Sequence, residues 1–161
     1  MDQEHIIEVK ETTIFQDGQT VLDHVNFSIL QEEFVYLIGK TGSGKSSLLK
    51  TLYADLPLKI GEIQMVGYHI PKMKERDIPF MRRKIGIIFQ DFELFYDRTI
   101  AENLEFIMRS TGWKDKAKIK VRMAEVLMRV GLGGVNNKMP HQLSGGEQQR
   151  VVIARALINE P

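Results

Sequence analysis

The chain contains no cysteine among its 161 residues, which excludes a disulfide framework and any metal site or nucleophile built on a thiolate. Its formal net charge is only +1, so bulk electrostatics favours neither nucleic acid nor an acidic lipid surface as the main partner. No apolar run is long enough to span a bilayer, and the acidic start MDQEHIIEVK lacks the layout of a secretory signal. We therefore expect any membrane role to come through a partner.

Strand signals dominate the N-terminal half. Two β-rich runs, 6–15 and 21–29, flank a turn signal at Asp17-Gly18, and residues 61–70 indicate a further strand pair. Two continuous apolar runs, FVYLI and IGIIFQ, have the pattern of strands buried on both faces of a parallel sheet, and they occupy 34–38 and 85–90.

Helical periodicity dominates the rest of the chain from about residue 100 to 130. One face of that segment carries the apolar residues Ile119, Met123, Val126, Leu127 and Val130. Gly131 is expected to end this helix, and another is expected to start at Ser144 and run through Leu157. We therefore divide the chain into a β/α core over 1–90, a mostly helical subdomain over 91–143 and a returning helix over 144–161.

A phosphate-binding loop is predicted by GKTGSGKS at 39–46, which fits the pattern G-x-x-x-x-G-K-[ST]. Glycines let the backbone wrap a triphosphate and aim its N–H groups at it, and a helix after the loop adds its positive end. Lys45 is expected to reach the β- and γ-phosphates, Ser46 to ligate Mg²⁺ and Ser47 to touch the α-phosphate. The predicted nucleotide-binding residues are Gly39, Lys40, Thr41, Gly42, Ser43, Gly44, Lys45, Ser46 and Ser47. The alternative, a flexible turn with an incidental lysine, is disfavoured by the strand-then-helix context.

This loop alone does not distinguish a kinase, a GTPase and an ATPase. Guanine recognition needs N-K-x-D, whereas the nearest match, Asn137-Lys138-Met139-Pro140, ends without a carboxylate. Adenine is therefore the favoured base. Phe15 could stack on it, or could equally be an ordinary core phenylalanine.

A second helix start, Ser144-Gly145-Gly146-Glu147, has two interpretations. Ser at the N-cap and Glu three residues later form a capping box, which needs no ligand. Capping does not require the two glycines, however, and they leave backbone N–H groups open to a second anion.

Together these features resemble the ABC ATPases. LSGGEQQR at 143–150 is similar to that family's signature motif, Gln90 in IIFQD to its Q-loop glutamine, and Phe15 to its base-stacking aromatic residue. The resemblance covers essentially the whole chain. It implies an α/β fold, with a P-loop NTPase core, an N-terminal β-subdomain and an inserted α-helical subdomain, and makes 144–161 the signature helix.

The resemblance also implies ATP, Mg²⁺ and a head-to-tail homodimer. ATP held by residues 39–47 of one copy would be covered by the signature residues of the other, Ser144, Gly145, Gly146 and Glu147. Gln90 would contact Mg²⁺ and the attacking water. The implied catalytic residues are then Lys45 and Gln90, and the implied metal ligands are Ser46 and Gln90. At Glu147 many family members carry Gln.

A longer stretch, KERDIPFMRRKIGIIFQDFELFYDRTIAENL, resembles the bacterial cell-division ABC ATPases of the FtsE type. Such proteins are peripheral at the cytoplasmic face of the inner membrane, bound to a polytopic partner of the FtsX type, and control cell-wall hydrolysis. ATPases of lipoprotein-release or macrolide-export systems share much of this pattern. Soluble ABC proteins of DNA repair or translation fit less well, because the two motifs are closely spaced and only one cassette is present.

Family members continue beyond a segment like ALINEP into an apolar strand ending in Asp-Glu, followed by a histidine. The resemblance therefore implies a cassette that is incomplete at its C-terminus, with apolar strand faces exposed. This polypeptide is expected to bind ATP but to hydrolyse it negligibly. The alternative interpretation is a nucleotide-binding module without catalysis.

Overall fold

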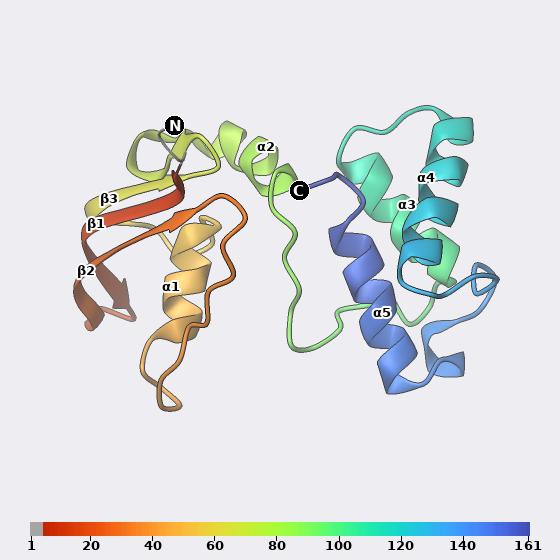
Figure 1. Cartoon of the computed structure of the whole chain (residues 1–161), viewed down its shortest axis with the longest axis horizontal. Helices are drawn as coiled ribbons and strands as arrows, with labels where there is room; N and C mark the ends of the chain where they lie inside the picture. Colours follow the sequence, from red (N-terminus) through yellow and green to blue (C-terminus); the bar gives the residue numbers. More distant parts are fainter. Residues whose placement is uncertain (1–4) are drawn as a thin grey trace. The chain divides into compact units, whose positions relative to one another are not determined.

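The computed structural model describes residues 5–161, which form two compact units, one ending at Arg82 and one spanning Arg83–Pro161. The first unit contains a β-sheet and helix α1, and the second contains helices α3 to α5 (Figure 1). A short helix, α2 (Ile78–Arg83), carries the chain from one unit to the next. The boundary between the units precedes Gln90.

A long hairpin opens the sheet. Strands β1 (His5–Gln16) and β2 (Gln19–Leu30) pair antiparallel, and the turn between them is formed by Asp17 and Gly18. Both turn residues have positive φ angles, 52° and 78°, which Asp tolerates and Gly adopts freely. The hairpin predicted from the two β-rich runs is therefore confirmed.

A second, shorter hairpin completes the sheet. Strands β3 (Ile60–Met65) and β4 (Tyr68–His69) pair antiparallel around a turn at Gly67, and β3 also pairs with β1, so the strand order is β2-β1-β3-β4. This confirms the strand pair predicted over 61–70. The chain continues through short 3₁₀ helices at Ile70–Lys72 and Glu75–Asp77 into α2.

Helix α1 (Lys45–Leu52) packs against β1, as the sequence after the glycine-rich loop predicts. It buries Leu48 and Leu52, and the sheet buries Val9 and Ile63 from two paired strands. Their burial forms the core that holds the start of α1 in place.

The two strands predicted at 34–38 and 85–90 are not formed, so that prediction is wrong for this chain. Neither segment pairs with another strand within residues 5–161. Phe34 and Ile38 are 82% and 86% exposed, and Ile88 is 52% exposed. A parallel strand exists only where a neighbour supplies the ladder hydrogen bonds, and without one these apolar runs stay irregular and uncovered. The exposure of apolar segments was expected.

The second unit is a small helical bundle. It consists of α3 (Ile100–Ser110), α4 (Lys116–Arg129), a 3₁₀ helix at Pro140–Gln142 and α5 (Gly145–Ala156). Figure 1 shows α3, α4 and α5 grouped together, and each pair of these helices is in contact. Their shared core includes Ile100, Leu104, Met108, Ile119, Met123, Val126, Leu127, Val151 and Val152.

The helix predictions for this unit are confirmed, with two helices rather than one over 100–130. The predicted apolar face of α4 is buried, and Val130, which follows the helix, packs against the same core. Gly131 adopts a φ of 69° just beyond the helix end, a conformation that favours glycine. Among the helices described within residues 5–161, none has the length and hydrophobicity needed to cross a membrane.

Candidate functional site

The start of α1 is shaped by a glycine. Gly44, the N-cap residue, has a φ of 88°, and no side chain caps the helix there. A Cβ at this position would lie 2.8 Å from Leu22 Cγ and 2.8 Å from Val21 Cγ1 on β2. Only glycine therefore fits. The first N–H groups of α1 are left without a capping side chain, which is the arrangement that binds anions at a helix N-terminus.

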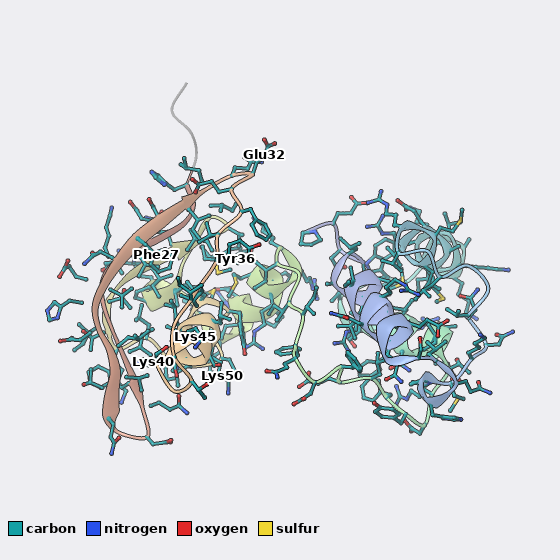
Figure 2. The ribbon with its side chains drawn as sticks, turned by 60° about the horizontal axis from the view of Figure 1, so that its bottom comes forward. Phe27, Glu32, Tyr36, Lys40, Lys45 and Lys50 are labelled. Atoms are coloured by element: carbon teal, nitrogen blue, oxygen red, sulfur yellow. The ribbon has the colours of Figure 1, made fainter. Side chains whose placement is uncertain are left out.

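The side chain of Lys45 hydrogen-bonds back to the loop that precedes α1. Its Nζ donates to the carbonyl oxygens of Gly39 and Lys40 at 2.9 and 2.7 Å, and lies 3.5 Å from Ser43 Oγ. Ser43 N also donates to Lys40 O at 3.2 Å, which tightens the turn. Figure 2 shows Lys40, Lys45 and Lys50 around α1. The ammonium group of Lys45 thus lies among oxygen acceptors, and phosphate oxygens could replace these acceptors.

The two serines after Lys45 have different surroundings. Ser46 is exposed, so its hydroxyl is accessible to a metal ion bound with a phosphate. Ser47 is only 5% exposed, and its Oγ donates to Gln16 Oε1 at 2.7 Å. This bond ties the end of β1 to α1. The contact of Ser47 with an α-phosphate stays a prediction, as do the contacts of residues 39–46.

Phe15 precedes Gln16 at the same end of β1, the end that the Gln16–Ser47 bond joins to α1. Phe15 is half-buried. Lys59 Nζ lies 5.8 Å from the centroid of its ring, at cation–π distance. Base stacking by Phe15 stays a prediction.

An apolar cavity of about 510 Å³ opens beside the loop. Lys45 and Ser43 are among its lining residues, but most of the lining comes from apolar side chains such as Phe27, Leu37 and Leu49. A triphosphate needs several donors, which this lining does not offer. The cavity is therefore uncovered core under the exposed 34–38 segment, and the loop itself stays the predicted phosphate site.

The second motif forms a complete capping box at the start of α5. Glu147 N donates to Ser144 Oγ at 3.3 Å, and Glu147 Oε2 accepts from Ser144 N at 2.8 Å and from Ser144 Oγ at 2.7 Å. These bonds, from the Ser144 hydroxyl first and its backbone N–H second, lower the pKa of Glu147. Gly145 and Gly146 are exposed, and a Cβ at either would meet no atom within 4 Å. The capping interpretation is confirmed, and it leaves both glycines accessible.

Gln90 is exposed and lies in an irregular segment of the second unit, as do the residues on either side of it. The residues that follow it are held by α5: Arg155 Nη1 donates to Glu93 O at 2.7 Å and Nη2 to Phe92 O at 3.1 Å. The loop 39–47 and Phe15 belong to the first unit, whereas Gln90 and the signature residues belong to the second.

Three residues at these sites carry no sequence signal that would have identified them. Gln16 and Lys59 read as exposed polar residues near turns, and Arg155 reads as a charge on the solvent face of a helix. Each contacts a residue far away in the sequence, as Arg155 contacts Glu93. A local sequence pattern does not encode such a pair.

Comparison with known proteins supplies an independent finding. The sequence profile of the ABC transporter family matches residues 22–161. The cell division ATP-binding protein FtsE of Streptococcus pneumoniae (serotype 2, strain D39) is 38% identical over 157 residues, which are 97% of this chain and 68% of the relative. The methionine import ATP-binding protein MetN 2 of Salmonella choleraesuis (strain SC-B67) is 41% identical over 140 residues, which are 87% of this chain and 41% of the relative.

A solved structure is similar as well. The dimeric structure of MJ0796, a bacterial ABC transporter cassette, superposes with a TM-score of 0.82 at 34% sequence identity. The match covers 96% of this chain and 70% of that one. The same cassette has also been solved as a dimer in a post-hydrolysis state, bound to ADP and Pi.

Proposed function

Because this chain belongs to the ABC transporter family, we propose that it is an ATP-binding subunit that couples ATP binding and hydrolysis to a membrane partner. The observation that carries the proposal is the uncapped start of α1, with Lys45 held over residues 39–43 by oxygen acceptors. That geometry offers backbone N–H groups and one ammonium group to a polyphosphate.

In the first unit, different residues bind different parts of ATP·Mg²⁺. Lys45 exchanges its carbonyl acceptors for the β- and γ-phosphate oxygens, and Ser46 presents its exposed hydroxyl to Mg²⁺. Phe15 receives the adenine ring on its exposed part.

The signature residues of the second unit serve a nucleotide bound by another copy. Support comes from the exposed glycines Gly145 and Gly146 at the start of α5, and from the dimeric cassette structure to which this chain is similar. In such a homodimer Gln90 orients the attacking water and contacts Mg²⁺, and the cassette stabilises the transferred phosphoryl group by position and charge.

The cellular role that we propose is bacterial cell division, through control of cell-wall hydrolysis. The support is the similarity to FtsE proteins over nearly the whole chain. The protein would then be peripheral at the cytoplasmic face of the inner membrane and bound to a polytopic partner of the FtsX type. Similarity to a methionine import ATPase supports a second candidate, an ATP-binding subunit of an import system. Co-purification of the membrane partner distinguishes the two.

For a polypeptide of these 161 residues alone, we propose ATP binding with negligible turnover. Support comes from the family resemblance, in which the residues that polarise the attacking water follow a segment like ALINEP. The test is a steady-state phosphate-release assay on that polypeptide, with Lys45→Met as the control for contaminating ATPases. Turnover at an ordinary ATPase rate that is lost in Lys45→Met would overturn this part of the proposal.

Lys45→Met tests the nucleotide site, with Lys50→Met as the matched control. Lys50 is an exposed lysine on the same helix, one residue before the buried Thr51. We expect Lys45→Met to weaken ATP·Mg²⁺ binding by about 10- to 100-fold, because a charged donor to phosphate contributes about 1.5–3 kcal/mol. Isothermal titration calorimetry measures the affinity. Equal affinity in both variants and the wild type would refute the site.

A further inference from the structure

Helix α4 leaves one of its faces uncovered. Its buried residues pack in the core that it shares with α3 and α5, which lie to one side of it (Figure 1), and its other side is exposed. Four apolar residues follow that exposed side at intervals of four, three and four residues: Ala117, Val121, Ala124 and Met128. At about 100° per residue they fall within an arc of about 60° around the helix axis and extend about 16 Å along it. We call these four residues the α4 seam.

The spacing and the side chains of the α4 seam fit a second α-helix. Alternating intervals of three and four residues form the stripe by which two helices pack side by side. Val121 and Met128 are 69% and 73% exposed, more than any other large apolar side chain described in the second unit. The two alanines of the seam allow another helix axis to approach closely. A bilayer surface is the poorer fit, because interfacial helices insert larger residues such as Trp, Phe and Leu.

The charges beside the α4 seam are positive and uncompensated. The helix carries five basic side chains and a single acidic one, Glu125, whose charge is already matched. Its Oε2 accepts from Arg122 Nη1 at 2.9 Å, and its Oε1 accepts from Arg129 Nη2 at 2.7 Å. The remaining basic side chains are exposed and form no ion pair within residues 5–161: Lys116, Lys118 and Lys120. At about 100° per residue, Lys118 lies on one side of the seam and the other two lysines lie on the opposite side.

We propose that the α4 seam is a docking site for an α-helix of another protein, one whose apolar stripe is flanked by Asp or Glu side chains. Charge complementarity selects this occupant, because acidic side chains on both flanks of the stripe would meet the three free lysines. A second copy of this chain fits less well. The one carboxylate that its α4 could offer already accepts hydrogen bonds from two arginines.

The seam is formed before any partner arrives. Asp115 caps the start of α4, since its Oδ1 accepts from Ala117 N at 2.8 Å and from Lys118 N at 3.2 Å. The opposite face of the helix is fixed in the core by residues such as Val126, which is fully buried. Docking therefore requires little ordering of α4 itself. None of the residues predicted to contact nucleotide lies on α4, so the proposal does not depend on ATP binding.

The probe for this site is a synthetic, fluorescein-labelled peptide of about three heptads, with Leu at the seam positions and Glu beside them. One control peptide has the same composition in scrambled order, and a second has Lys in place of every Glu. Fluorescence anisotropy measures the affinity of each peptide for the full chain. Four variants of the chain are compared with wild type: Val121→Glu, Met128→Glu, the pair Lys118→Glu with Lys120→Glu, and Phe106→Glu.

We expect wild type to bind the Glu-flanked peptide at least about tenfold more tightly than either control peptide, and less tightly as salt is raised. Val121→Glu should weaken this binding by about tenfold, because it places a charge in an apolar contact. The double lysine variant should instead prefer the Lys-flanked peptide. Phe106 is a matched control, since it is a 41% exposed apolar residue on α3 of the same unit, and Phe106→Glu should bind as wild type does.

Equal affinity of wild type for the Glu-flanked and scrambled peptides overturns the proposal, and so does wild-type binding in Val121→Glu. If Val121→Glu is unfolded by Trp113 fluorescence, Met128→Glu decides by the same criterion. A loss of binding in Phe106→Glu alone places the peptide elsewhere and also overturns the site. Two further results would replace the acidic helix as the occupant: self-association in sedimentation velocity that Val121→Glu abolishes, and binding to phosphatidylglycerol vesicles, without peptide binding, that the double lysine variant abolishes.

Discussion

Replacing Arg122 by methionine should destabilise the helical unit far more than replacing a nearby exposed arginine that shares one of its partners. Arg122 lies on α4 and is 5% exposed. Its Nε donates to Ile158 O at 3.0 Å, and its Nη2 donates to Leu157 O at 2.6 Å. Its Nη1 lies 2.9 Å from Glu125 Oε2 and 3.0 Å from Glu160 Oε1. These contacts hold the residues that follow α5 against α4.

The magnitude follows from burial. A hydrogen bond from a charged donor contributes about 1.5–3 kcal/mol, and Arg122 makes two to backbone carbonyls that end a helix. The ion pairs contribute little, because the side chains of Glu125 and Glu160 are 42% and 74% exposed. Methionine keeps most of the aliphatic packing. We therefore expect Arg122→Met to lower the free energy of unfolding by about 3–6 kcal/mol.

Urea unfolding followed by tryptophan fluorescence measures this loss of unfolding free energy in the helical unit. Trp113 is the single tryptophan of the chain, and its Nε1 donates to Asn159 Oδ1 at 3.1 Å, next to the residues that Arg122 holds. Its emission therefore reports on the helical unit. In Arg122→Met the pKa of Glu125 should also rise toward its ordinary value, because the hydrogen bond from Arg122 is the main cause that lowers it.

Arg129→Met is the control for this measurement. Arg129 donates to the same carboxylate, Glu125 Oε1, at 2.7 Å, but its side chain is 56% exposed. Its loss should therefore cost less than about 1 kcal/mol. If the two variants lose the same free energy of unfolding, buried hydrogen bonds to the carbonyls after α5 do not stabilise the unit, and the reasoning fails.

Gly61→Ala should strongly destabilise the first unit, because the φ of Gly61 is 98° and the new Cβ would lie 2.4 Å from Thr12 Cα. Gly67, at a φ of 81°, has open space around it, so Gly67→Ala should lower the free energy of unfolding by only about 1–2 kcal/mol. Thermal or urea melts measure both effects. Asn103→Ala should lower the unfolding free energy by about 2–3 kcal/mol by Trp113 fluorescence, because four hydrogen bonds of a buried amide are lost; a change below 0.5 kcal/mol, at about the scatter for neutral surface substitutions, would contradict this. Because the pKa of Glu147 is lowered in the folded chain, its stabilising contribution is present above the ordinary glutamate pKa of about 4.3 and is lost as pH falls through the lower folded value. Melting temperature should therefore fall in that acidic range less steeply in Glu147→Gln than in wild type.

Local patterns predicted most of the helices and hairpins because their determinants are local. Asp17 and Gly18 supply the positive φ angles of the first turn, and Ser144 with Glu147 supplies both halves of a capping box. Likewise the apolar face of α4, from Ile119 to Leu127, needs only the helical period to be recognised. Each of these features is complete within a few residues of sequence.

The failures at 34–38 and 85–90 have a different origin. An apolar run such as FVYLI indicates that a segment is suited to burial between neighbours, but the ladder hydrogen bonds come from other segments. Phe34 is 82% exposed because no strand within residues 5–161 pairs with it. The contacts of Arg122 and Arg155 were missed for a related reason, since each joins elements more than thirty residues apart.

The two interpretations of the second motif do not compete in the structure. The capping box at α5 uses the side chains of Ser144 and Glu147 and the N–H groups of those same two residues. The intervening N–H groups belong to Gly145 and Gly146, and neither donates to any group within residues 5–161. The space around both residues is open, since a Cβ at either would meet no atom within 4 Å, and an approaching phosphate could reach their N–H groups. The cap therefore orders the helix end, and the two residues that capping does not need are the ones that remain able to bind an anion.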